Sequence, residues 1–209
     1  MHIGIDFDNT IAGYEKMIRR FACENNWIEA SKLGGKRSLR DGIRHLPGGE
    51  QKWMILQAEI YGPRMEEAEL INGVDHFLRA CLEKGEKVSI ISHKTTYANA
   101  AQGGVDLRKA ALAWMDRNAF FADSGFGLDT NNVHFADTRR EKCQMIGALG
   151  CNLFIDDLRE VFADLNFPKN VKKILFETEP DLTSGPGIRI CTSWSEILDS
   201  VFGGDLLSG

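Results

Sequence analysis

The sequence lacks the cysteine patterns that are typical of disulfide frameworks and zinc sites. Its five cysteines are odd in number and widely spaced, and no CxxC pair occurs. Paired spacings are the sequence signature of both kinds of site, so we predict neither. We expect the cysteines to be small buried side chains or incidental thiols, which fits a reducing compartment.

Long apolar runs are missing as well. No run of about 18 apolar residues, the length needed to cross a bilayer as a helix, is present. The first residues form an apolar strand pattern, without the charged segment and long apolar stretch of a secretory leader. We therefore expect a cytoplasmic protein with no membrane partner.

Excess positive charge is also absent. The chain has 25 basic and 30 acidic residues among its 209, a net charge of −5. A nucleic-acid-binding protein usually shows a basic footprint, so we expect no nucleic acid polymer as a partner. The length predicts one domain, or one domain with a sizeable insertion, and a chain this long, of which 43% is hydrophobic, can build a core without disulfides or metals. No internal repeat or low-complexity tract is visible.

Short apolar runs alternate with longer amphipathic segments. The short runs are rich in β-branched or aromatic residues, as buried parallel strands are. The pattern predicts strands at 1–7, 87–91, 132–136, 152–155 and 172–176, and helices at 73–84, 107–118, 140–149 and 193–202. This alternation predicts an α/β fold, a Rossmann-like, doubly wound parallel sheet with helices on both faces.

One segment interrupts the alternation. Residues 13–70 separate the first strand from the helix before the second strand, far more than a simple connection needs. We predict helices at 14–27, 51–61 and 64–70, with a Gly- and Arg-rich stretch at 31–50. The expected organisation is a core domain of residues 1–12 and 71–209, with a small helical cap of residues 13–70 inserted after the first strand.

Polar residues follow the predicted strands at their carboxyl ends, where doubly wound sheets bind ligands. Asp6 and Asp8 lie at the end of the first strand, and Ser92 lies at the end of the second. Lys142 lies in the helix after the third strand. Asp156 and Asp157 follow the fourth strand.

The clustered carboxylates predict a metal site. Like charges repel, and a hard dication makes their proximity tolerable. Magnesium prefers such oxygen ligands. We expect Asp6 and Asp156 to bind Mg²⁺ through their side chains and Asp8 through its backbone carbonyl. Asp157 would hold metal-bound waters or orient Lys142.

These elements resemble the four motifs of the haloacid dehalogenase superfamily of phosphotransferases. DFDNT at residues 6–10 matches the DxDx[TV] motif, and Ser92 in VSIISHK matches the second. Lys142 best matches the third motif, with Arg140 as the alternative, and LFIDD supplies the acidic pair of the fourth. The run LGCNLFIDDLREV is similar to the deoxyribonucleotidase-like branch. The resemblance covers the whole chain, including the place where the family inserts a cap.

The resemblance implies a mechanism. Asp6 would attack phosphorus, while Mg²⁺ and Lys142 offset the repulsion between two anions. The Ser92 hydroxyl and the backbone amides near Phe7 and His93 would hold the phosphoryl oxygens. Asp8 would protonate the leaving group and later activate water. Family members that cleave carbon–halogen bonds lack this second Asp, so its presence favours hydrolysis of a phosphate ester.

The sequence thus predicts a magnesium-dependent phosphomonoesterase that acts through an aspartyl phosphate. Its partner would be a small phosphate ester, of the nucleotide or phosphosugar class. Two alternatives stay open: a regulatory protein that binds ligand without turnover, and a mutase-like phosphotransferase whose acceptor is not water. A measurement of free phosphate against phosphate transferred to an acceptor would distinguish a hydrolase from such a phosphotransferase. The oligomeric state is not predicted.

Further cationic residues are candidates for substrate binding. His93 and Lys94 follow Ser92 directly and could contact the substrate, or they could have structural roles. Arg37, Arg40 and Arg44 lie in the inserted segment. If they face the site, they would bind a remote negative group of the substrate. The alternative is a solvated polar loop.

Overall fold

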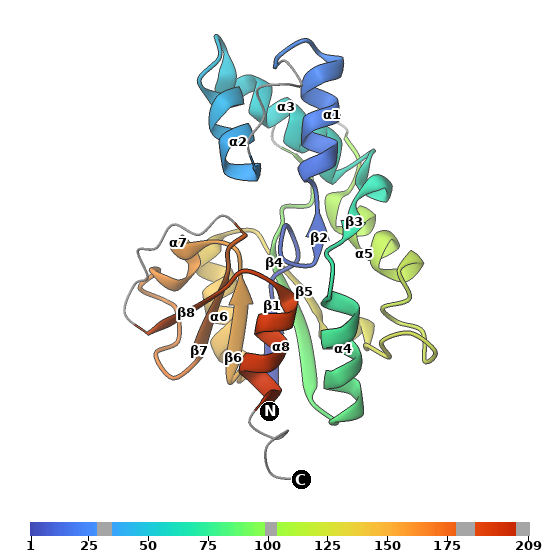
Figure 1. Ribbon diagram of the computed structural model, residues 1–209, viewed down its shortest axis with the longest axis vertical. Helices are drawn as coiled ribbons and strands as arrows, with labels where there is room; N and C mark the ends of the chain where they lie inside the picture. Colours follow the sequence, from blue (N-terminus) through green and yellow to red (C-terminus); the bar gives the residue numbers. More distant parts are fainter. Residues whose placement is uncertain (29–34, 99–103, 179–186, 204–209) are drawn as a thin grey trace. The chain divides into compact units, whose positions relative to one another are not determined.

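The computed structural model describes residues 1–28, 35–98, 104–178 and 187–203 (Figure 1). The chain divides into two compact units. The α/β unit consists of Met1–Ala12, Leu70–Lys94 and Asn118–Gly209, and the helical unit consists of Gly13–Glu69 and Thr95–Arg117. Within the described ranges, no helix is both long and apolar enough for a membrane span.

A six-stranded sheet forms the centre of the α/β unit, in the order β5-β4-β1-β6-β7-β8 (Figure 1). Every paired neighbour in it runs parallel. The central strand, β1, is buried along its whole length between β4 and β6. The strands are β1 (His2–Ile5), β4 (Lys87–His93), β5 (Val133–Ala136), β6 (Leu153–Asp156), β7 (Lys172–Phe176) and β8 (Ile188–Cys191).

Apolar layers cover both faces of this sheet. Neighbouring residues of a strand point to opposite faces, and β7 shows the result. Leu175 joins the cluster that contains Cys143 and Ile146 of α6 (Arg139–Ala148) and Val161 of α7 (Arg159–Phe162). Phe176 instead faces the other layer, where the centre of its ring lies 6.0 Å from the centre of the Trp194 ring. Trp194 begins α8 (Trp194–Phe202), and α8 packs against α4 (Val74–Glu83). The predicted Rossmann-like α/β fold is confirmed.

Gly4 of β1 allows a close approach inside the first of these layers. A Cβ at this position would lie 2.5 Å from Cδ2 of Phe154 and 3.0 Å from the sulfur of Cys151. Backbone φ plays no part here, because the residue is in a regular strand. The missing side chain therefore lets the Phe154 ring pack directly on the central strand.

The helical unit contains a helix that the sequence pattern places in the core domain. It comprises α1 (Glu15–Glu24), α2 (Lys36–Arg44), α3 (Gly49–Tyr61), the 3₁₀ turn η2 (Met65–Glu67) and α5 (Leu107–Arg117). In α5, the Trp114 indole donates a hydrogen bond to the Ala68 carbonyl at 2.9 Å, and Arg117 pairs with Glu66. The unit therefore extends beyond the predicted 13–70. An amphipathic sequence pattern indicates that one face of α5 is buried, but it does not indicate which of the two units that face packs against.

Three local predictions differ from the structure. Residues 64–70 do not form one helix: η2 is followed by β3 (Glu69–Leu70), which pairs with β2 (Ala12–Gly13). Helix α2 occupies part of the Gly- and Arg-rich stretch, with Leu39 and Ile43, four residues apart, buried. Strand β8 was not predicted. Its Arg189 is exposed at the edge of the sheet, so the apolar run is short.

Candidate active site

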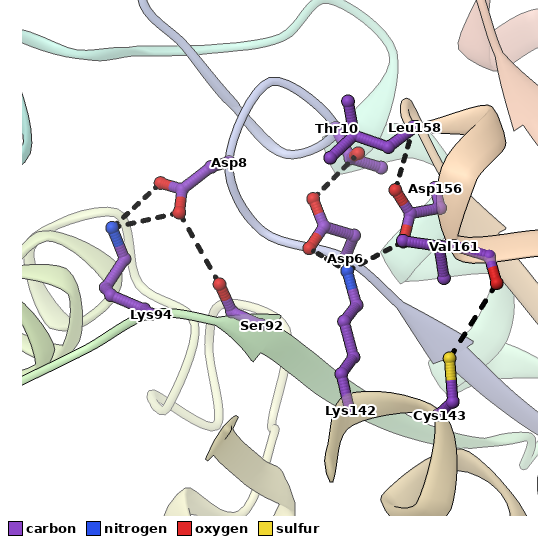
Figure 2. A network of polar contacts seen from close by, with 10 residues as sticks. All are labelled: Asp6, Asp8, Thr10, Ser92, Lys94, Lys142, Cys143, Asp156, Leu158 and Val161. Carbon is purple, nitrogen blue, oxygen red and sulfur yellow. Dashed lines mark hydrogen bonds and ion pairs between the residues drawn. The ribbon is translucent and has the colours of Figure 1, made fainter. Parts of the chain in front are cut away.

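The carboxyl ends of three neighbouring strands bring several of the predicted site residues together (Figure 2). Strand β1 lies between β4 and β6, so Asp6, Ser92 and Asp156 reach the same edge of the sheet. The Asp6 amide donates to the Ile155 carbonyl at 2.9 Å, which extends the β1–β6 ladder up to the carboxylate. All three side chains are buried.

Lys142 connects two of these carboxylates. Its Nζ lies 2.6 Å from Oδ1 of Asp6 and 2.7 Å from Oδ2 of Asp156 (Figure 2). Only 1% of Lys142 is exposed, although it lies on a helix rich in charged residues. Thr138 begins that helix by accepting a hydrogen bond from the Glu141 amide at 3.1 Å, an N-cap that fixes where the first turn starts.

Burial and charge shift the pKa of each member of this cluster. Burial raises the pKa of Asp6 and of Asp156 to about 6, although the Lys142 ammonium opposes the shift in both. The Asp157 and Asp8 carboxylates raise the pKa of Asp6 further. Burial alone would lower the pKa of Lys142, but Asp156 and Asp6 together raise it above its ordinary value. The lysine is therefore charged, and the carboxylates outnumber the ammonium.

The other oxygens of the two carboxylates are also held. The Thr10 hydroxyl donates to Oδ2 of Asp6 at 3.1 Å, and the Leu158 amide donates to Oδ1 of Asp156 at 2.9 Å. Thr10 is itself anchored, because the Trp194 indole donates to its carbonyl at 3.0 Å. No local sequence pattern indicates this contact, because Trp194 lies 184 residues along the chain from Thr10.

The donor set fits a hard dication. Asp6, Asp156 and Asp157 each offer a carboxylate oxygen, and these oxygens lie within 4.8 Å of one another. A carboxylate oxygen can accept a second interaction, so the contacts with Lys142 do not exhaust Asp6 or Asp156. The negative charge left over beside Lys142 is what a divalent cation would balance.

Asp8 lies in a second polar group at the same edge. Its carboxylate is near Lys94, whose Nζ is 3.0 Å from Oδ1 and 2.9 Å from Oδ2 (Figure 2). The Ser92 hydroxyl lies 3.5 Å from Oδ2, at the outer limit of a hydrogen bond. The Asp8 side chain is 18% exposed, against 6% for Asp6.

Phe7 and His93 have few atoms that could contact a ligand. The Phe7 side chain is completely buried, so only its backbone could contact a ligand. The His93 ring uses Nε2 to donate to the Asp137 carbonyl at 3.1 Å, since a carbonyl can only accept. Burial lowers the pKa of His93, which favours the neutral ring. That both backbone amides hold a phosphoryl group remains a prediction.

The two candidates for the third motif, Lys142 and Arg140, lie in different surroundings on α6. Arg140 is exposed on α6, whereas Lys142 contacts Asp6 and Asp156. Sequence spacing alone could not separate them. Only the burial of one face of α6, with Cys143 and Ile146 beside Lys142, determines which cation turns toward the sheet.

Two arginines of α2, Arg40 and Arg44, pair with nearby acids. Arg40 Nε lies 2.8 Å from Asp41, and Arg44 donates to both Glu50 oxygens at 2.7 and 3.0 Å. The side chain of Arg37 lies outside the described residues. Substrate binding by these arginines remains a prediction.

Comparison with known proteins gives matches at the level of structure. No family model and no curated protein sequence matches the chain. A haloacid dehalogenase-like family hydrolase from Xanthomonas campestris matches with a TM-score of 0.54 and 11% identity, over 100% of this chain and 97% of that one. A HAD-superfamily hydrolase from Ehrlichia chaffeensis gives 0.56 and 11%, over 97% and 96%.

A HAD family hydrolase from Deinococcus radiodurans, solved with bound phosphate and sodium, gives a TM-score of 0.55 and 14% identity, over 98% of this chain and 96% of that one. The chain therefore has the fold of the haloacid dehalogenase superfamily of hydrolases. The predicted resemblance is confirmed at this level, and the deoxyribonucleotidase-like branch remains a prediction.

Proposed function

We propose that the chain is a magnesium-dependent phosphomonoesterase that hydrolyses a small phosphorylated metabolite through an aspartyl phosphate on Asp6. The observation that carries the proposal is the Lys142 bridge, with Nζ at 2.6 Å from Asp6 and 2.7 Å from Asp156. A nucleophilic carboxylate attacks a phosphate only if the repulsion between them is offset. A buried ammonium in direct contact with that carboxylate supports this role.

Asp6, Asp156 and Asp157 would hold Mg²⁺ with their side chains, and Asp8 would add its backbone carbonyl. When bound, the metal supplies positive charge to the phosphoryl oxygens and orients the substrate. Lys142 and Thr10 contact different oxygens of Asp6 and so fix the plane of its carboxylate. This pre-orientation favours attack on phosphorus by one defined oxygen.

Asp8 would carry the protons. It would donate one to the leaving oxygen as the Asp6–phosphorus bond forms and the ester bond breaks. It would then take one from the water that releases phosphate from Asp6. The Ser92 hydroxyl, now 3.5 Å from Asp8, would donate to a phosphoryl oxygen instead. Phosphate bound to the Deinococcus radiodurans hydrolase agrees with an anion site in this fold.

A panel of about a hundred phosphorylated metabolites, weighted toward nucleotides and phosphosugars, tests the proposal. Release of free phosphate from a subset, in the presence of magnesium, is expected from the wild type and not from Asp6→Asn. Equal release by Asp6→Asn would contradict the nucleophile. Phosphate that reappears on an added acceptor, with no free phosphate, would indicate a phosphotransferase. No reaction with any member would favour a binding protein.

A further inference from the structure

Lys94 is a buried cation of the α/β unit that is held both through its backbone and through its side-chain ammonium. It follows β4 directly, and its amide donates to the Ala136 carbonyl at 3.0 Å, which continues the β4–β5 ladder. The residue is 4% exposed. A lysine that is buried to this extent needs a counter-charge, because desolvation of an ammonium is costly.

Asp8 provides that counter-charge with both oxygens. The Lys94 Nζ lies 3.0 Å from Oδ1 and 2.9 Å from Oδ2, so the ammonium faces the middle of the carboxylate (Figure 2). The same nitrogen lies 5.8 Å from the centre of the Phe7 ring, whose electron-rich π system favours a cation. Both contacts hold the ammonium on the motif that carries Asp6 and Asp8.

We propose that Lys94 is a positioning residue for Asp8, rather than the substrate-binding residue that its place after Ser92 suggests. This rests on the proposed function, in which Asp8 transfers protons. Proton transfer requires the carboxylate within about 2.6–3.2 Å of the reacting oxygen. The Asp8 side chain is partly exposed, and its hydrogen bond from Ser92 is long at 3.5 Å. A contact to both oxygens restricts rotation of the carboxylate.

A double-mutant cycle separates positioning from substrate binding. The variants are Lys94→Met, Asp8→Asn and the pair, with Lys109→Met as a surface control whose side chain is 84% exposed. The phosphoryl-transfer step is measured in single turnovers with an alkyl and an aryl phosphate. For Lys94→Met we expect a loss of about ten- to a hundredfold with the alkyl ester and a smaller loss with the aryl ester. KM should change less than about threefold.

The pair should be no slower than Asp8→Asn alone, because Lys94 acts through Asp8. Multiplied losses in the pair, or a KM raised tenfold or more with an unchanged rate constant, would overturn the proposal and assign Lys94 to the substrate. Lys94→Arg, which keeps a charge able to contact both oxygens, should recover part of the rate lost in Lys94→Met.

A crystal structure of Lys94→Met tests the same point without turnover. We expect the Asp8 carboxylate in more than one conformation, while Asp6 and Lys142 keep theirs. A single Asp8 conformer as in Figure 2 would overturn the proposal. If the wild type releases no phosphate from any substrate, the proposed function fails, and this structural result still decides whether Lys94 positions Asp8.

Discussion

The two ends of β1 carry buried polar groups of opposite kinds. At the start of the strand, His2 lies in a neutral network: Nδ1 donates to the Leu149 carbonyl and the Ser89 hydroxyl donates to Nε2, both at 2.9 Å. At the other end, Asp6 lies in a charged cluster in which carboxylates outnumber the Lys142 ammonium. Two side chains that are separated by a single short strand thus face different electrostatic conditions.

The difference between the two ends of β1 separates a polar network that stabilises the fold from a charged cluster that costs stability. In the His2 network each ring nitrogen has one matched partner, so burial leaves no charge to be neutralised. At the Asp6 end, burial raises the pKa of Asp6 and Asp156 to about 6, so at neutral pH the fold holds carboxylates that would be more stable in water. Natural proteins accept such local costs where a site must be preorganised for a ligand.

The largest expected effect is the loss of activity in Asp6→Asn. An amide cannot form an aspartyl phosphate, so turnover should fall by about a thousandfold or more. The melting temperature should stay the same or rise, because one buried carboxylate is removed while Asp156 still pairs with Lys142. Steady-state kinetics and thermal unfolding at neutral pH measure both. Residual activity within tenfold of the wild type would remove Asp6 as nucleophile.

Removal of metal should have the next largest effect. A chelator should abolish turnover, and magnesium should restore it, because the ionised carboxylates need a dication. The metal should also stabilise the fold, by about 2.7 kcal/mol at a concentration a hundredfold above Kd. Thermal unfolding with and without Mg²⁺ measures this, and Asp156→Asn should lose most of the shift. Full turnover in chelator would contradict the metal assignment.

Trp194→Phe should lower activity less, because Trp194 acts only indirectly, through the loop that carries Asp6 and Thr10. Phenylalanine keeps most of the packing with Phe77 but loses the hydrogen bond to the Thr10 carbonyl. We expect a loss of stability of about 1 kcal/mol and a roughly tenfold lower kcat with little change in KM, as expected for misplacement of a catalytic group.

Trp114→Phe is the matched control for this experiment. Trp114 is equally buried and donates a 2.9 Å hydrogen bond to the Ala68 carbonyl, within the helical unit. It should show a similar loss of stability with kcat unchanged. Equal losses of kcat in both variants would mean that Trp194 acts only through general stability.

The sequence predicted the α/β core because its cues are local. Short apolar runs become buried strands, and the parallel order brings their carboxyl ends to one edge, so the sequence alone places Asp6, Ser92 and Asp156 together. Lys142 was also visible in the sequence as a candidate for the third motif. Its contact with both carboxylates depends on which face of α6 is buried.

The parts that the sequence did not predict depend on long-range packing. The pairing of Lys94 with Asp8 and of Trp194 with Thr10 joins residues 86 and 184 positions apart, and no local pattern encodes such contacts. The assignment of α5 to the helical unit has the same origin. Helix α2 could have been found from the spacing of Leu39 and Ile43, but the surrounding charges and Gly42 masked that signal.

The smallest expected effect concerns the neutral end of β1, where pH should act on stability alone. Burial lowers the pKa of His2 from its usual 6.5, against the raising effect of the hydrogen bond to Leu149. Below pH 6.5 the unfolded chain therefore binds more protons at this position than the folded chain does. The stability contributed by the neutral ring is complete above that pH and is lost as pH falls through 6.5 and toward the folded pKa.

His2→Gln removes this titration, so its free energy of unfolding should fall less steeply than that of the wild type between about pH 7 and 5.5. Comparison with the wild type is necessary, because burial lowers the pKa of His93 and His134 as well, and Asp6 and Asp156 contribute with the opposite sign below about pH 6. Urea titrations across this range give the two slopes, and His76→Gln, at a side chain that is 77% exposed, is the surface control.

Parallel curves for the wild type and His2→Gln would mean that the charged ring is accommodated where Ser89 now donates, since a rotated hydroxyl can accept instead. In that case the contrast between the two ends of β1 would lie in the carboxylates alone.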